Sequence, residues 1–181
     1  LPQKYIYSLK RRMQTESIFE VYLGLDLDIK DLGFGDYCYE IQDKNGIRCL
    51  MFVYSNLDPT CAPAGCSNIE IIHFMRADLF NLAISADNGT RGKNYRRLKQ
   101  QIKKIFIDIV AKLLDLDDFQ DHIVYQDAAT PITFQRYTNN TRGSFAGYTA
   151  TFGQSIVNPV SISTPVKNLF LAGQWINLGG G

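Results

Sequence analysis

The stretch Ser17-Ile-Phe-Glu-Val-Tyr-Leu-Gly-Leu25 decides the fold of this chain. Its apolar residues recur at every second position, which is the period of a β-strand with one buried face. The side chains on that face are Phe19, Val21, Leu23 and Leu25. The stretch therefore predicts a strand at the centre of the fold's apolar core.

Further strands follow along the chain. Residues 37–41 and 47–54 are rich in β-branched and aromatic side chains, and the segment between them contains Asn45-Gly46. Asn and Gly tolerate positive φ, so this dipeptide predicts a hairpin turn. Residues 69–74 and the short run 123–125 also read as strands.

The clearest helix runs from Asn94 to Leu114. Its apolar residues step by three and four positions, as one face of an amphipathic helix requires. The residues of this stripe, which we expect to pack on other apolar elements, are Tyr95, Leu98, Ile102, Ile105, Ile109 and Leu113, and Phe106 and Val110 widen it. A shorter helix is predicted to begin with Thr130 as N-cap and Pro131 at its first position. Strands and helices do not alternate regularly, so the sequence predicts an α+β fold with a mixed or antiparallel sheet.

Charge is distributed unevenly along the long predicted helix. Its N-terminal half carries the cations Lys93, Arg96, Arg97, Lys99, Lys103 and Lys104, and aspartates follow its C-terminus. Both placements oppose the helix macrodipole. Two interpretations are open: a solvated outer face, or a basic surface that meets an acidic partner or anionic lipid headgroups.

Composition excludes several classes of protein. The chain has 181 residues, 45% of them hydrophobic, and a formal net charge of +1. Such a chain is not typical of disordered or nucleic-acid-binding proteins. Its four cysteines form no CxxC pair and it has only two histidines, so no metal site is predicted. GxSxG, HExxH and Walker motifs are missing, and no catalytic residue is assigned.

The C-terminal segment carries the most informative pattern. Residues 168–173 are apolar on both faces, as in a central parallel strand covered on both sides. Gln174 and Trp175 follow, and then three glycines at 179–181. Glycines at such a place let a ligand approach the backbone closely, because no Cβ intervenes.

This segment resembles the C-terminal flavin motif of the phytoene desaturase family, which includes carotenoid isomerases and retinol saturases. The motif residues are Leu169-Phe-Leu-Ala-Gly-Gln-Trp175 and Gly179-Gly180-Gly181. Other segments resemble the family in the same order along the chain. They are residues 21–25, 58–65, the "TP-x-T-x-x-R-Y-T" segment 130–139 and the "G-x-x-x-G" segment 143–147.

The resemblance implies an FAD-dependent oxidoreductase that acts on a carotenoid- or retinoid-like apolar polyene. It implies flavin contacts at Gly173, Gln174, Trp175, Gly179, Gly180 and Gly181. It implies substrate contacts at Tyr137, Phe145, Tyr148 and Phe152. Residues 1–166 would form the substrate-binding domain, and residues 167–181 the last strand and glycine loop of the FAD-binding domain.

The family's nucleotide-binding GxGxxG motif is missing, because Gly33-Phe34-Gly35 has no third glycine in place. We therefore expect a fragment that binds FAD weakly by itself and is inactive alone. The alternative is a stand-alone module that holds apolar ligands without catalysis. A cytoplasmic protein, with peripheral membrane contact, is expected because no signal peptide or membrane-spanning run is evident.

Overall fold

The computed structural model describes residues 1–149, 151–154 and 159–176. Five antiparallel strands form one sheet in the order β2-β3-β4-β1-β5. The strands are β1 (Ser17–Leu25), β2 (Cys38–Gln42), β3 (Arg48–Val53), β4 (Ser67–Met75) and β5 (Ile123–Ala129). The helices are α1 (Gln3–Lys10), α2 (Tyr54–Leu57), α3 (Asp78–Ala86), α4 (Lys93–Leu113) and α5 (Pro131–Thr138). The predicted α+β class is confirmed, and the sheet is antiparallel.

Strand β1 lies between two neighbouring strands. Val21 of β1 is paired with Ile71 of β4 on one side and with Ala128 of β5 on the other. All four apolar residues predicted to share a face of β1 are buried, at 2% exposure or less. The predicted hairpin joins β2 to β3, and Gly46 takes a φ of +83° in its turn.

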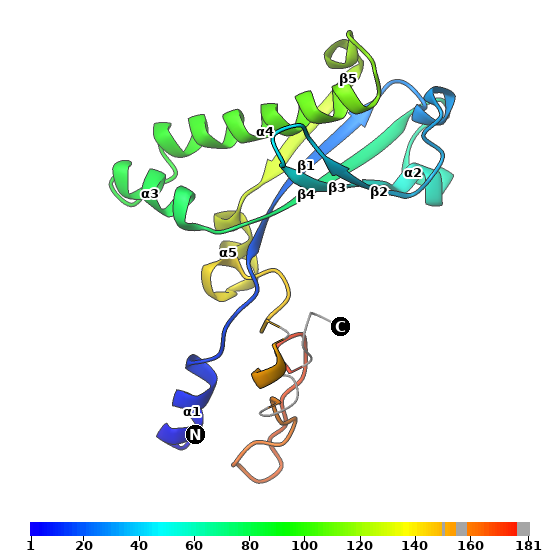
Figure 1. Cartoon of the computed structure of the whole chain (residues 1–181). Helices are drawn as coiled ribbons and strands as arrows, with labels where there is room; N and C mark the ends of the chain where they lie inside the picture. The colour runs from blue at the N-terminus through cyan, green and yellow to red at the C-terminus, as the bar shows by residue number, and fades with distance from the viewer. Residues whose placement is uncertain (150, 155–158, 177–181) are drawn as a thin grey trace.

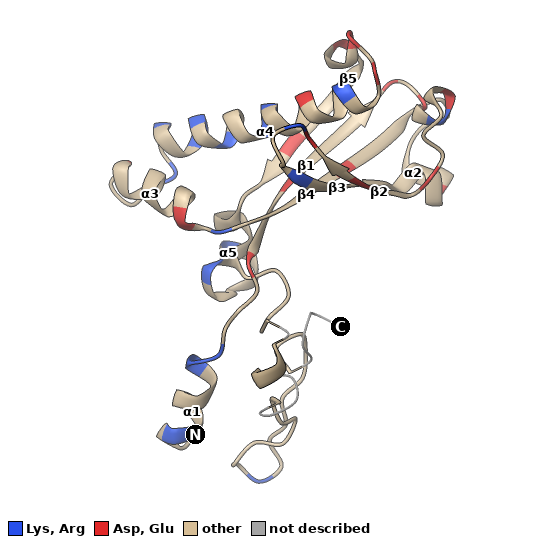
Figure 2. Ribbon diagram, in the orientation of Figure 1, with Lys and Arg blue, Asp and Glu red and all other residues tan. Residues whose placement is uncertain are grey.

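Helix α4 lies across one face of the sheet (Figure 1). It begins and ends within one residue of the predicted bounds. Figure 2 shows that Lys and Arg residues recur along this helix. Two of them form ion pairs: Lys99 with Asp127, at 3.0 Å between Nζ and Oδ1, and Lys104 with Asp108, at 2.8 Å between Nζ and Oδ2.

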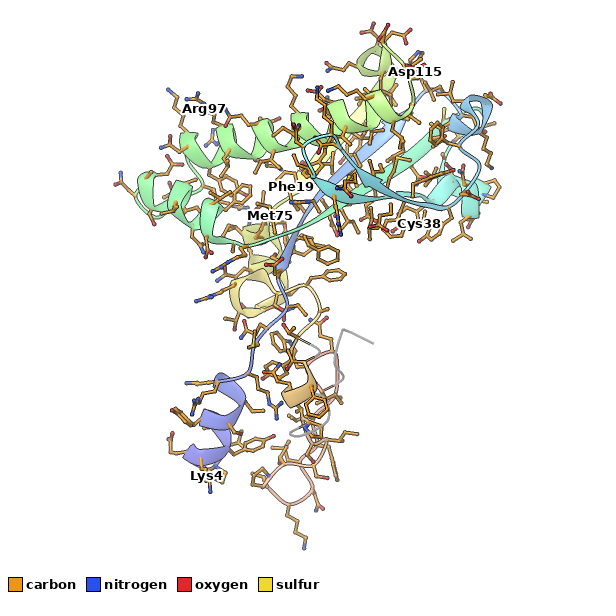
Figure 3. The ribbon with its side chains drawn as sticks, viewed as in Figure 1. Lys4, Phe19, Cys38, Met75, Arg97 and Asp115 are labelled. Atoms are coloured by element: carbon orange, nitrogen blue, oxygen red, sulfur yellow. The ribbon has the colours of Figure 1, made fainter. Side chains whose placement is uncertain are left out.

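The core fills the space between α4 and the sheet. Phe19 of β1, labelled in Figure 3, stacks on Phe80 of α3 and Phe106 of α4. The predicted stripe is wrong at Ile105, which is 44% exposed, whereas Phe106 is 3% exposed. Successive helical residues are about 100° apart, and the face toward the sheet passes through Phe106 and Ile109.

Helix α5 begins where the sequence predicted. The Thr130 hydroxyl accepts a hydrogen bond from the backbone N–H of Thr133, and the Thr133 hydroxyl accepts one from the N–H of Thr130, so the two form a capping box. The Thr130 hydroxyl also lies 2.9 Å from the Tyr95 hydroxyl of α4. This buried contact joins the start of α5 to the long helix.

The C-terminal segment differs from its prediction. Residues 168–173 are not a doubly covered strand, since they form one isolated antiparallel bridge, between Ser163 and Phe170. Leu169 is 45% exposed and Phe170 is 65% exposed. A central strand needs a neighbour at each edge, and the described residues supply only this one bridge. In Figure 1 the segment lies below the sheet, alongside the N-terminal part of the chain.

Candidate functional site

The sheet has one face that α4 does not cover. Because β1 residues alternate, Glu20 and Tyr22 point to the face opposite Phe19. The strand register places Ile72 of β4 beside Glu20, and Glu70 of β4 beside Tyr22. We call this the uncovered face. Within the described ranges, no long helix lies across it.

Two tyrosine–carboxylate pairs lie on the uncovered face. The Tyr22 hydroxyl donates a hydrogen bond to Glu20, and the Tyr54 hydroxyl donates one to Glu70 at 2.5 Å. Glu20 is only 7% exposed, which is unusual for a carboxylate. Burial raises its pKa, the Tyr22 hydrogen bond opposes this rise, and the nearby Glu70 charge adds to it.

The tyrosines of these pairs remain protonated at neutral pH. Burial and the hydrogen bond to Glu20 raise the pKa of Tyr22. For Tyr54, the hydrogen bond to Glu70 is the main cause of a raised pKa. Each tyrosine hydroxyl can thus donate its hydrogen bond to the neighbouring carboxyl group. The motif search missed Glu20, although strand alternation alone assigns it to the face away from Phe19.

Aromatic rings surround these pairs. Tyr37 packs on Phe52 and Tyr54, with ring centroids 5.4 and 5.6 Å apart. Phe74 on β4 is 50% exposed and makes an edge-to-face contact with Phe145, with centroids 5.9 Å apart. One predicted substrate residue, Phe145, therefore lies against the uncovered face.

A second aromatic contact joins a predicted substrate residue to a predicted flavin residue. Tyr148 and Trp175 lie edge to face, with ring centroids 5.0 Å apart. The indole N–H of Trp175 donates to Asn140 Oδ1 at 3.1 Å, and the Asn140 amide donates to the Ser144 carbonyl at 2.9 Å. We call the contacts among Asn140, Tyr148 and Trp175 the aromatic junction.

Gly147 permits the close approach beside this junction. It has a φ of +78°, and a Cβ there would lie 2.5 Å from the carbonyl oxygen of Gln174. Gly173 also has a positive φ, of +101°, but a Cβ there would meet no atom within 4 Å. Of the two glycines, only Gly147 is required for packing within the described structure.

The remaining predicted site residues lie apart from the junction or beyond the description. Tyr137 is 77% exposed and Phe152 is 73% exposed. The guanidinium of Arg136 lies over the Tyr137 ring, 5.5 Å from its centroid. Gly179, Gly180 and Gly181 lie outside the described residues, so their predicted flavin contacts stay predictions.

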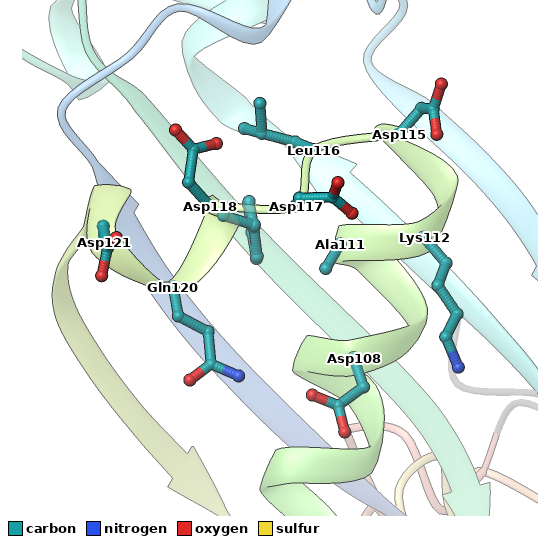
Figure 4. A pocket seen from close by; sticks show the side chains of 10 residues that line it. Asp108, Ala111, Lys112, Asp115, Leu116, Asp117, Asp118, Gln120 and Asp121 are labelled. Atoms are coloured by element: carbon teal, nitrogen blue, oxygen red, sulfur yellow. The ribbon is translucent and has the colours of Figure 1, made fainter.

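A pocket of about 490 Å³ lies elsewhere, beside the C-terminal end of α4 (Figure 4). Its walls include Asp108, Asp115, Asp117, Asp118 and Asp121. Such walls do not suit an apolar polyene. In the part of the chain that the structure describes, no group of three or more metal-ligating side chains is arranged to hold an ion. Within the same residues, no helix is both long and apolar enough to cross a membrane.

Near this pocket, His122 links the start of β5 to the end of β1. Its Nδ1 lies 2.8 Å from Asp26 Oδ1, and its Nε2 lies 3.7 Å from Asp118 Oδ2. The hydrogen bond to Asp26 is the main cause of a raised His122 pKa. The other histidine, His73, contacts the Arg48 carbonyl at 2.7 Å and packs on Phe106.

Comparison with known proteins confirms the resemblance inferred from the motifs. The chain is 26% identical to the all-trans-retinol 13,14-reductase of Danio rerio, over 91% of this chain and 31% of the relative. It is 25% identical to the 4,4'-diapophytoene desaturase (4,4'-diaponeurosporene-forming) of Staphylococcus aureus strain Newman, over 91% of this chain and 34% of the relative. No family model matches the chain. The chain thus spans about a third of the length of these two oxidoreductases.

Proposed function

We propose that this chain is the substrate-facing part of a flavin-dependent oxidoreductase that desaturates, saturates or isomerises a carotenoid- or retinoid-like substrate. The observation that carries the proposal is similarity along 91% of the chain to enzymes named for a retinoid and a carotenoid precursor. The motif segments lie in the same order, and two of them approach each other beside the aromatic junction, where Gly147 lies against the backbone of Gln174.

The uncovered face supports an apolar substrate. Aromatic rings provide a large apolar area with few rotatable bonds to restrict, which suits a conjugated chain. Phe74 and Phe145 supply such an area at one end of the face, and Phe52 with Tyr37 supplies another. In this proposal the polyene lies along these rings, past the Glu20 carboxyl.

Gly173, Gln174 and Trp175 are the described residues proposed to hold the flavin. Gly173 fits this role, because its backbone has open space where a Cβ would project. FAD, when bound, would accept or deliver hydride. Gly179 to Gly181 are proposed to line the flavin ring, and residues 1–166 are proposed to form the substrate-binding domain. The proposal includes a cytoplasmic protein with peripheral membrane contact.

The test is made on the complete reading frame that contains these 181 residues. Purified protein is expected to carry flavin and to convert all-trans-retinol or a diapophytoene-type polyene. Gly180→Val is expected to abolish flavin absorbance per mole of folded protein. Gly35→Val is the matched control, because a Cβ at Gly35 meets no atom within 4 Å. Folded protein that carries no flavin and converts neither polyene would favour the alternative, a binding module without catalysis.

A further inference from the structure

The uncovered face carries an ordered line of side chains along β4. Phe74, Ile72 and Glu70 occupy alternate positions of this strand, so their side chains share one face. At a rise of about 3.4 Å per residue, Phe74 and Glu70 lie about 14 Å apart along the strand. Phe74 is half exposed, and Ile72 and Glu70 are half-buried. The line is therefore apolar at one end and carries a carboxylate at the other.

Aromatic residues flank the carboxylate of Glu70. The strand register places Tyr22 of β1 on one side of Glu70 and Phe52 of β3 on the other. The Tyr54 hydroxyl donates a hydrogen bond to Glu70 Oε2 at 2.5 Å, and the Tyr54 ring stacks on Phe52 with centroids 6.3 Å apart. Glu70 is thus held in place by one hydrogen bond and surrounded by apolar ring surface.

Glu70 keeps one carboxylate oxygen that can accept a further hydrogen bond. Among the described residues, only the Tyr54 hydroxyl donates to this carboxylate, and it binds Oε2. Within the same ranges, no Lys, Arg or His side chain forms an ion pair with Glu70. Glu20 differs, because it is only 7% exposed and lies behind the Tyr22 hydroxyl. Glu70 is therefore the acid of this face that a ligand can reach.

We propose that Glu70 selects polyene substrates that carry a terminal hydroxyl group over pure hydrocarbons. A hydrocarbon laid across Glu70 would remove water from the carboxylate and offer no hydrogen bond in return, which costs free energy. A hydroxyl group donates to Glu70 Oε1 and compensates for the lost water. The apolar end of the same chain then rests on Phe74 and Phe145, whose rings are in edge-to-face contact.

The inference rests on the proposed function, because it concerns the same face and narrows the class of substrate that lies on it. A site that forms a hydrogen bond with a substrate hydroxyl discriminates against the analogue that lacks the donor. The preference belongs to binding and is measured without turnover. Its failure can therefore be told apart from a failure of the proposed flavin chemistry.

The experiment compares all-trans-retinol with its methyl ether, in which the terminal oxygen can no longer donate. Binding to protein made from the complete reading frame is followed by the change in retinoid fluorescence. We expect the unchanged protein to bind the alcohol about tenfold more tightly than the ether. Glu70→Leu should bind the two retinoids equally, and Glu70→Gln, which keeps an acceptor oxygen, should retain part of the preference. Circular dichroism checks that every variant is folded.

Glu40→Leu is the matched control, because the register places exposed Glu40 on the same face at the edge strand β2. It should keep the full preference for the alcohol.

Several outcomes would overturn the inference. They are equal affinity for the two retinoids in the unchanged protein, binding of neither, a preference that survives in Glu70→Leu, and an equal loss in Glu40→Leu. Conversion of a diapophytoene-type polyene with no hydroxyl preference would overturn it and leave the proposed oxidoreductase standing. Selective binding of retinol by a protein that carries no flavin and converts no polyene would do the reverse.

Discussion

Tyr148 and Trp175 pack edge to face, with their ring planes 78° apart, and this contact ties the C-terminal segment to the loop after α5. The N-terminal segment meets the same place. The guanidinium of Arg12 lies 5.7 Å from the centroid of the Tyr148 ring, and Gln14 forms a backbone bridge with Tyr148. Tyr148 is therefore in contact with both the N-terminal and the C-terminal segments of the described chain.

Trp175 is the single tryptophan of the sequence and reports on this junction. We expect Tyr148→Ala to shift its fluorescence emission to longer wavelength, because the indole loses its aromatic neighbour and gains contact with water. Phe152→Ala is the control, since Phe152 is 73% exposed. Unchanged emission in Tyr148→Ala would show that the two rings are not in contact in solution.

Gly147 and Gly173 both have a positive φ, but only Gly147 lies close to another part of the chain. Substituting each of them therefore separates the cost of backbone strain from the cost of steric overlap. Ala in the left-handed region costs about 1–2 kcal/mol, so Gly173→Ala should reduce stability by about that amount. Gly147→Ala carries a similar strain and also places a Cβ 2.5 Å from the Gln174 carbonyl oxygen. We expect Gly147→Ala to be the more destabilising and to shift Trp175 emission. The measurements are thermal unfolding and fluorescence, and equal effects of the two changes would contradict the close approach at Gly147.

Much of the sheet could be predicted because its signals are local. Alternation in residues 17–25 gave β1 its bounds, and Asn45-Gly46 marked the hairpin. The helices α1 and α3 were missed, since eight- and nine-residue helices show at most two or three turns of periodicity. Ile105 was misplaced for a related reason. Apolar residues run along two adjacent lines on the surface of α4, and both lines fit a spacing of three and four residues.

The candidate site was only half accessible to sequence reasoning. Motifs pointed to Tyr148 and Trp175, but only the folded chain shows that they touch. Glu20 carries no motif, and its interest comes from burial and from the Tyr22 hydroxyl. The prediction of a central strand at 168–173 was wrong. A central strand needs strands on both sides, and the described residues provide a single bridge. Tertiary partners, which no local pattern encodes, decide such features.

His122 should titrate above the usual histidine range, because its Nδ1 bonds to Asp26. A raised pKa in the folded state means that the pair stabilises the protein at pH below the unfolded value of about 6.5. That contribution is lost as pH rises through the folded pKa. NMR titration of the His122 ring should show the pKa falling in Asp26→Asn and unchanged in Asp117→Asn. No fall in Asp26→Asn would contradict the bond.

The pH dependence of stability should show whether burial or the Tyr22 hydrogen bond has the larger effect on the pKa of Glu20. Because burial raises its pKa in the folded state, the carboxyl is protonated without cost below the unfolded value of 4.5. As pH rises through the folded pKa, ionisation of the buried group lowers stability. Glu20→Gln keeps an acceptor for the Tyr22 hydroxyl and removes that ionisation. We therefore expect Glu20→Gln to gain stability relative to the unchanged chain as pH goes from 4 to 8.

The check on Glu20 is urea unfolding at a series of pH values, with Glu40→Gln as the control. Glu40 lies on β2 and points to the same uncovered face, but it is exposed, so its replacement makes the same chemical change without altering a buried group. If Glu20→Gln were less stable than the unchanged chain at pH 8, the Tyr22 hydrogen bond would outweigh burial. The Tyr22 hydroxyl would then be what holds the Glu20 carboxylate ionised in the folded chain.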